Sequence, residues 1–168
     1  MPPRIVVAGG GPVGLTAALT LARNGLRVTV IEADAGVCDG SPAICISRRS
    51  LQLLDRLGVA APFLVKGLGW TEGTSYLGTT EIFHLHMPHA PADRFPPFIN
   101  LQQYDAEQFL AEACAATGLV DIRWGHRIAD VKAGPEGAEL TVEPDGMVRA
   151  DWLIAADGAR SIVREKLG

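Results

Sequence analysis

The stretch that decides the fold is residues 5–32, which read IVVAGGGPVGLTAALTLARNGLRVTVIE. Its first four residues form an uninterrupted apolar run, which is typical of a parallel strand buried on both faces. Pro12 suits the first turn of a helix, and Gly25 suits its end, where glycine readily takes a left-handed conformation. The apolar side of this helix carries Leu15, Ala18, Leu19 and Ala22. A second apolar run at residues 28–31 ends in Glu32, so the stretch predicts a strand, a helix and a strand.

Three glycines between the two strands, Gly9, Gly11 and Gly14, form the pattern G-x-G-x-x-G. The first permits a tight turn from strand to helix, the second has no side chain to keep a diphosphate from the backbone, and the third lets the helix pack close to the strand. Alone this pattern is weak. Here a buried strand precedes it, a helix follows it and an acid ends the next strand. The stretch therefore predicts a dinucleotide-binding site of the Rossmann type.

The dinucleotide is expected to make two kinds of contact in this stretch. Its diphosphate should lie at the positive end of the helix dipole, against the first turn with Pro12 and Val13. Glu32 should accept hydrogen bonds from both hydroxyls of the adenosine ribose. Neither contact distinguishes NAD from FAD, so the identity of the dinucleotide depends on the rest of the chain.

The remaining sequence predicts a continuation of the α/β fold. Residues 33–47 are expected to be a loop, and Ser47 can cap a helix that follows it. Expected helices cover residues 48–57, 60–66 and 104–117, with a short last helix from about Ser161. Expected strands cover residues 120–124, 127–131, 139–142, 147–150 and 152–156. The first four of these strands, with glycine and proline turns among them, suggest a small antiparallel β-meander, and the last is expected to be a final buried strand.

Two further segments complete a resemblance to a known family. Residues 157–168 fit D-G-x-x-S-x-V-R-x-x-L-G, and residues 99–107, INLQQYDAE, contain Gln-x-x-x-Glu at a helix start. With the glycine motif and the helix near Arg49, they resemble the p-hydroxybenzoate hydroxylase family of flavoprotein monooxygenases. The resemblance implies that FAD is the cofactor. It also implies cofactor contacts by Asp157, Gly158 and Gln103, with Gln102 as the alternative glutamine.

One position departs from the family pattern. Many relatives have an arginine before the alanine that matches Ala43, and it contacts the flavin diphosphate and the Asp-Gly aspartate. This chain has Pro42 there, which supplies neither a charge nor an N–H donor. Arg48 or Arg49, at the start of a helix, can take its place if an anion lies nearby, and Arg49 is the choice here. Otherwise both are solvated surface arginines.

The resemblance also implies a reaction. NADH or NADPH reduces the flavin, and one oxygen atom is transferred to an aromatic, phenol-like substrate. The cofactor carries the difficult chemistry, so no catalytic side chain is identified. Family members continue well past the Asp-Gly motif. Residues 1–168 are therefore expected to be the FAD-binding front part of a longer enzyme and inactive alone. Residues 67–98, rich in glycine, proline and aromatics, begin the substrate-domain sheet, whose uncovered face would bind a C-terminal half or a second copy.

Composition excludes several other classes of protein. The net charge of −4 gives no basic excess for nucleic acid, and no apolar run approaches the ~20 residues of a membrane span. The odd number of cysteines, with no C-x-x-C pair, suits a cytoplasmic protein. His84, His86 and His89 lack a second ligand cluster, so no metal is expected. Two alternatives stay open: an NAD(P)-dependent dehydrogenase fragment and a non-catalytic nucleotide-binding or interaction module.

Overall fold

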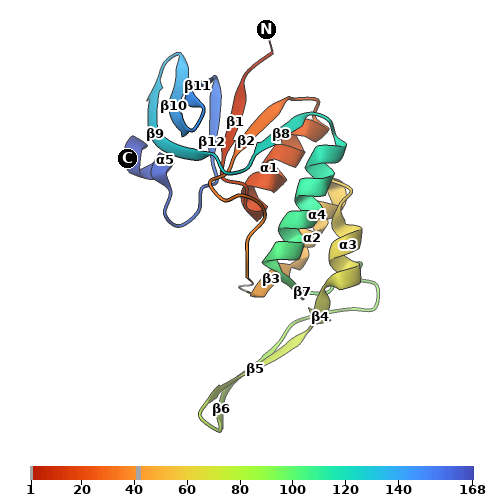
Figure 1. Cartoon of the computed structure of the whole chain (residues 1–168). Coiled ribbons are helices and arrows are strands. Elements are labelled where there is room, and N and C mark those ends of the chain that lie inside the picture. The colour runs from red at the N-terminus through yellow and green to blue at the C-terminus, as the bar shows by residue number, and fades with distance from the viewer. Residues whose placement is uncertain (1, 41–42) are drawn as a thin grey trace. The chain divides into compact units, whose positions relative to one another are not determined.

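The computed structural model describes residues 2–40 and 43–168, with side chains from residue 45 onward in the second range. The chain divides into two compact units, residues 1–40 with 104–168 and residues 41–103. Figure 1 labels the helices and strands of both. The predicted excursion of residues 67–98 lies inside the second unit. No helix of the described residues combines the length and the apolar character needed to cross a membrane.

The first unit is built around a four-stranded parallel sheet in the order β12-β1-β2-β8. Its strands are β1 (Ile5–Ala8), β2 (Val28–Ile31), β8 (Val120–Arg123) and β12 (Trp152–Ala155). In register, Ile5 lies between Trp152 and Val28, and all four residues of β1 are buried. The expected apolar runs therefore do form parallel strands, with β1 and β2 at the centre of the sheet.

Helix α1 (Pro12–Arg23) packs against β1, β2 and β8, and α4 (Gln103–Ala116) leads into β8. The buried side of α1 includes Leu15, Ala18, Leu19 and Ala22, the residues that its spacing predicted. Gly25 ends the helix region with a φ of 79°, a conformation that other residues rarely take. In α4, the buried Cys114 donates a hydrogen bond from Sγ to the carbonyl oxygen of Leu15, 3.5 Å away. These contacts join the two helices to each other.

The meander covers the other face of the parallel sheet. It consists of β9 (Arg127–Gly134), β10 (Gly137–Glu143) and β11 (Gly146–Ala150) in the order β11-β10-β9, and α5 (Ile162–Leu167) packs on β9. One apolar cluster joins it to the sheet, made of Val6, Ala8, Ile31, Val131, Leu140, Val142, Ala150 and Val163. Because a parallel sheet has to be covered on both faces, this cluster completes the core. The predicted meander is confirmed for its last three strands, with β9 and β10 longer than expected. It is wrong for its first strand, because residues 120–123 form β8, which pairs parallel with β2 in the other sheet.

The second unit contains a strand that the sequence did not predict. Its sheet has the order β3-β7-β4, with β3 (Ala43–Ser47), β7 (Phe98–Gln102) and β4 (Leu68–Trp70), and it carries α2 (Arg48–Arg56) and α3 (Ala60–Lys66). The expectation of a loop over residues 33–47 is therefore wrong for its last five residues. Strand β3 pairs antiparallel with β7, some fifty residues later. A short strand whose partner is so distant leaves no local periodicity to read.

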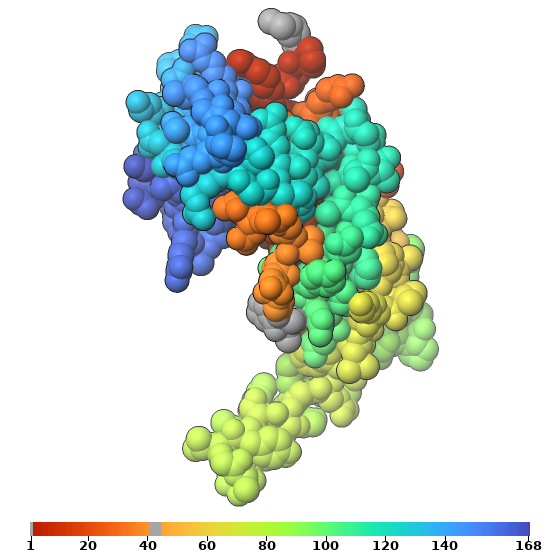
Figure 2. All heavy atoms as spheres, viewed as in Figure 1, coloured from red at the N-terminus to blue at the C-terminus, as the bar shows by residue number. Residues whose placement is uncertain are grey.

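A long hairpin extends the second unit. Strands β5 (Glu72–Leu77) and β6 (Thr80–His86) pair antiparallel with each other, and in Figure 2 their yellow-green atoms project from the rest of this unit. Every residue of β6 is exposed, including the neighbours Ile82 and Phe83. Since successive side chains point to opposite faces of a strand, both faces of the hairpin are uncovered.

Candidate functional site

The glycine motif lies between the carboxyl end of β1 and the start of α1. Gly9 has a φ of 102°, and a side chain there would collide with the backbone oxygen of Ala156. A side chain on Gly14 would strike the carbonyl oxygen of Gly9. Packing within the protein therefore requires glycine at both positions. The contact at Gly9 also brings the backbone of Asp157 next to the glycine loop.

Gly11 differs from the other glycines of the loop. A first side-chain carbon on Gly11 would meet only Oε1 of Glu107, at 3.9 Å, whereas on Gly10 it would lie 2.9 Å from Cβ of Glu32 and 3.1 Å from Cζ3 of Trp124. Nothing in the described part of the chain crowds Gly11. A group that approaches the backbone at Gly11 from outside is the remaining reason for a glycine, and the diphosphate of a dinucleotide fits that space.

The first turn of α1 is suited to an anion. Gly11 is its N-cap residue, Pro12 is its first residue, and no side chain of the described residues caps it. The turn holds no acidic residue, and the side chain of Val13 is 72% exposed. The unpaired N–H groups and the helix dipole therefore present partial positive charge at the glycine loop. FAD fits these residues because its diphosphate supplies the matching negative charge.

Glu32 is half-buried at the carboxyl end of β2. Its Oε2 accepts a hydrogen bond from the backbone N–H of Gly10 at 2.5 Å, and its Oε1 accepts one from Asp34 N–H at 2.8 Å. These two bonds hold the carboxylate beside the glycine loop. A carboxylate has about four acceptor positions, so Glu32 keeps capacity for the two hydroxyls of a ribose.

Glu107 is a buried acid beside the same loop that the sequence did not assign to the site. Its side chain is 3% exposed, and Oε2 accepts a hydrogen bond from the backbone N–H of Cys38 at 2.6 Å. Burial, reinforced by the negative charge of Glu107, raises the pKa of the Cys38 thiol to about 11. The burial of Glu107 could have been read from the sequence, because its helical spacing places it on the same inward side of α4 as Leu110 and Cys114. The residue therefore joins the loop after β2 to α4, next to Gly11.

Asp157 follows β12 and organises the next helix. Its Oδ1 accepts a hydrogen bond from the Ser161 hydroxyl at 2.6 Å, and its Oδ2 accepts one from Val163 N–H at 3.1 Å. Ser161 in turn caps α5 by accepting from Arg164 N–H at 3.0 Å. Gly158 is exposed with a φ of 75°. Asp157 thus holds the N-cap residue and the first turn of α5 in place, and it keeps acceptor positions on both oxygens.

The other predicted contacts belong to the second unit. Arg48 donates from Nε to the Phe95 carbonyl oxygen at 3.0 Å and pairs with Asp93 at 3.1 Å, so it anchors the loop before β7. Arg49 is exposed on the first turn of α2. Of the alternative glutamines, Gln102 ends β7 and is exposed, and Gln103 begins α4 and is half-buried. Pro42 lies outside the described residues.

The three histidines have polar partners of their own. His84 Nδ1 lies 2.9 Å from the Thr74 hydroxyl, and His86 Nδ1 lies 3.1 Å from Glu72 Oε1, across the hairpin. His89 Nδ1 lies 3.5 Å from Asp93. Among residues 2–40 and 43–168, no cluster of three or more His, Cys, Asp or Glu side chains has the arrangement of a metal site.

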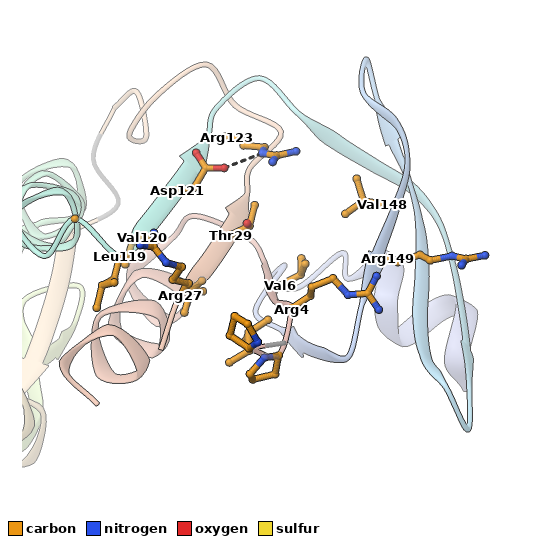
Figure 3. Close-up of a pocket in the computed structure, with 15 residues that line it drawn as sticks. Arg4, Val6, Arg27, Thr29, Leu119, Val120, Asp121, Arg123, Val148 and Arg149 are labelled. Atoms are coloured by element: carbon orange, nitrogen blue, oxygen red, sulfur yellow. Dashed lines mark hydrogen bonds and ion pairs between the residues drawn. The ribbon is translucent and has the colours of Figure 1, made fainter. Parts of the chain in front are cut away.

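A cavity of about 450 Å³ lies at the opposite end of the parallel sheet, near the amino ends of β1, β2 and β8 (Figure 3). Four arginines line it, but carboxylates already hold three of them. Arg4 pairs with Asp151 at 2.6 Å, Arg123 with Asp121 at 3.0 Å and Arg149 with Glu139 at 2.9 Å. In Figure 3 the Arg149 side chain points away from the cavity. This cavity is therefore separate from the glycine loop, which lies at the carboxyl ends of the strands.

Comparison with known proteins places the chain among flavoproteins. The sequence profile of the FAD binding domain family matches residues 4–168. The 6-methylpretetramide 4-monooxygenase of Streptomyces rimosus is 33% identical over 170 residues, which cover 99% of this chain and 30% of that protein. Para-nitrophenol 4-monooxygenase of Pseudomonas sp. (strain WBC-3) is 33% identical over 171 residues, which cover 98% of this chain and 42% of that protein.

A solved structure agrees with these relatives. The flavin-dependent monooxygenase PieE, in complex with FAD and substrate, superposes with a TM-score of 0.85 at 26% identity, covering 100% of this chain and 32% of that one. The chain thus spans less than half the length of each of these three relatives. The α/β fold and the FAD cofactor expected from the sequence motifs are confirmed by these similarities.

Proposed function

The chain belongs to the FAD binding domain family, and from that premise we propose that it forms the FAD-binding part of an NADH- or NADPH-dependent monooxygenase that hydroxylates an aromatic, phenol-like substrate. When bound, FAD supplies the redox chemistry. The protein supplies binding, orientation and exclusion of water. Relatives named for a nitrophenol and a pretetramide support an aromatic substrate class.

The observation that carries the proposal is the contrast between Gly11 and its neighbours. Gly9 and Gly14 are glycines because the protein itself fills the space around them, whereas Gly11 faces open space at an uncapped helix N-terminus. Diphosphate binding there uses the backbone N–H groups of the turn that begins with Pro12 and Val13. Glu32, held by two backbone N–H groups, accepts the ribose hydroxyls of the adenosine half.

The remaining cofactor contacts are proposed from the family motifs. Asp157 and Gly158 lie at the carboxyl end of β12, and the Asp157 carboxylate keeps acceptor positions for a hydroxyl of the flavin side. Gln103 and the exposed Arg49 are proposed as further contacts to the nucleotide. Arg49 is preferred over Arg48, because Arg48 is already engaged by Asp93 and Phe95.

Partner and location are part of the same proposal. The exposed apolar side chains of the β5–β6 hairpin, among them Leu77 and Ile82, support an uncovered sheet that binds a C-terminal half or a second copy. Three free thiols, Cys38, Cys45 and Cys114, support the cytoplasm as the location.

The first test is a titration of the chain with FAD, followed by the visible spectrum and flavin fluorescence. Glu32→Ala removes hydrogen bonds to a charged group, worth ~1.5–3 kcal/mol, so FAD should bind roughly ten- to a hundred-fold more weakly. Glu81→Ala, an exposed acid on β6, is the matched control and should bind FAD like the wild type. Equal affinities for the wild type and Glu32→Ala would remove Glu32 from the site.

The reaction is tested with the complete protein. Oxidation of NADH and of NADPH is followed with a panel of phenols, and products are identified by mass. Gain of one oxygen atom by a phenol, dependent on FAD, supports the proposal. Binding and turnover of nicotinamide without flavin would instead favour a dehydrogenase, and neither activity would favour a non-catalytic module.

A further inference from the structure

Trp124 follows β8 directly and lies against the acid that is proposed to hold the ribose. A first side-chain carbon on Gly10 would be 3.1 Å from Cζ3 of Trp124 and 2.9 Å from Cβ of Glu32, so the three residues meet at one point. They come from the carboxyl ends of β1, β2 and β8, which are neighbours in the sheet. The half-buried indole therefore lies beside the stem of Glu32.

The backbone holds Trp124 in this position. Glu32 N–H donates to the Arg123 carbonyl oxygen at 3.0 Å, and His126 N–H donates to the Glu32 carbonyl oxygen at 2.8 Å. Gly125 N–H donates to the Asp34 carbonyl oxygen at 2.7 Å. The pairing of β2 with β8 thus continues past the ends of both strands, and the distance between the indole and Glu32 does not depend on a flexible loop.

The order of the strands determines where the base of a bound nucleotide must lie. The diphosphate belongs at the end of β1, where α1 begins, and the ribose belongs at Glu32, at the end of β2. In a nucleotide the phosphate arm and the base are attached at opposite ends of the ribose, at C4′ and C1′, so the base continues in the same direction, over the end of β8. Trp124 is an aromatic side chain at that position, and it lines a pocket together with Ala35, Gly36 and Val37 and with residues of α4 and β8.

We propose that the Trp124 indole forms the wall against which the adenine of FAD packs, and that it favours a purine over a smaller pyrimidine at this position. The proposal rests on the proposed function, because it requires the ribose at Glu32. Stacking of one base on one aromatic side chain corresponds to roughly a 5- to 150-fold change in affinity on truncation to alanine. A purine offers the indole more area than a pyrimidine and so loses more when the ring is removed.

The experiment compares binding of ADP and UDP, which share the ribose and the diphosphate and differ only in the base. The full chain and its Trp124→Ala and Trp124→Phe variants are titrated with each nucleotide by calorimetry. The expected result for Trp124→Ala is at least a five-fold loss of ADP affinity with a smaller loss for UDP. Trp124→Phe keeps a ring and should recover most of the ADP affinity. A variant with a distorted loop would lose both nucleotides equally, which would overturn the proposal.

Two controls separate this inference from the proposed function. Trp152→Ala removes a 68% exposed tryptophan at the amino end of β12, the far end of the sheet. It should change the affinity for neither ADP nor UDP. Glu32→Ala should weaken ADP and UDP alike, because both carry the ribose. If Glu32→Ala behaves so while Trp124→Ala keeps the wild-type ratio of ADP to UDP affinity, the inference fails and the proposed function stands. If the wild type binds neither FAD nor ADP, both fail.

Fluorescence gives an independent readout. In the Trp70→Phe, Trp152→Phe background, Trp124 is the one remaining tryptophan of the chain, which has three. Adenine stacked on the indole should quench its emission as ADP is added, with the same Kd as calorimetry gives. Binding of ADP without a change in Trp124 emission would overturn the proposal.

Discussion

The β1–α1–β2 segment buries its apolar side chains, whereas the β5–β6 hairpin exposes its own. In the first, Val7, Leu15 and Val30 are 0% exposed, whereas in the second Leu77 is 75% and Ile82 is 62% exposed. The parallel sheet has α1 on one face and the meander on the other, so its core is complete within the first unit. A lone two-stranded hairpin has no such cover and is marginal on its own. The segment with the glycine motif therefore buries its apolar side chains within its own unit, while the hairpin leaves its apolar side chains exposed.

The largest expected effect is a direct test of this contrast. Leu15→Ala should lower the free energy of unfolding by about 2–5 kcal/mol, because it leaves a cavity under α1. Phe83→Ala, at a side chain that is 56% exposed, should stay within about 0.5 kcal/mol of the wild type. Urea unfolding followed by circular dichroism measures both. A loss at Phe83 as large as that at Leu15 would mean that the hairpin carries a core of its own.

A smaller loss of stability is expected at the helix caps, where each unit has an N-cap serine: Ser47 of α2 in the second unit and Ser161 of α5 in the first. Ser47 caps α2 through Ser50 N–H at 3.2 Å, and its change to alanine should cost about 1 kcal/mol. Ser161→Ala should cost more, about 2 kcal/mol, because its buried hydroxyl also donates to the Asp157 carboxylate at 2.6 Å, whereas the second partner of the Ser47 hydroxyl is the neutral Ser50 hydroxyl at 3.1 Å. Threonine at either position keeps the hydroxyl and serves as the control. Equal losses would show that the Ser161–Asp157 hydrogen bond adds nothing to the stability of the first unit.

The smallest effect concerns the exposed pair of Arg4 and Asp151. Hydrogen bonds from the Arg4 side chain and backbone lower the pKa of Asp151 to about 2, below the usual value of about 3.9 in an unfolded chain. This carboxylate therefore contributes stability above about pH 4, and the contribution is lost as the pH falls through about 2. The difference in unfolding free energy between the wild type and Asp151→Asn should shrink over that interval. If the difference in unfolding free energy stayed constant down to pH 2, the lowered pKa of Asp151 would be contradicted.

Much of the first unit could be predicted because its elements are marked locally. The run of residues 5–8, the spacing of Leu15 and Leu19, and the turn at Gly25 each depend on neighbours within a few residues. Strand β3 could not be predicted, since its antiparallel partner β7 lies in a distant part of the sequence. The same reason explains Glu107, whose spacing on α4 was visible but whose contact with the Cys38 backbone depends on the folding of two separate segments.

The sequence by itself determined the class of fold, the dinucleotide motif and the acid that follows the second strand, because strict local requirements of backbone and burial leave few alternatives at these positions. Only the tertiary structure showed which atoms approach the glycines of the motif. They are the backbone oxygen of Ala156 at Gly9 and that of Gly9 at Gly14, while a side-chain carbon on Gly11 would meet only Glu107 Oε1, at 3.9 Å. The tertiary structure also decided that Arg48 is engaged by its own unit and that Trp124 stands beside Glu32. Such relations depend on which strands are neighbours in the sheet, and that order arises from long-range packing that no local pattern records.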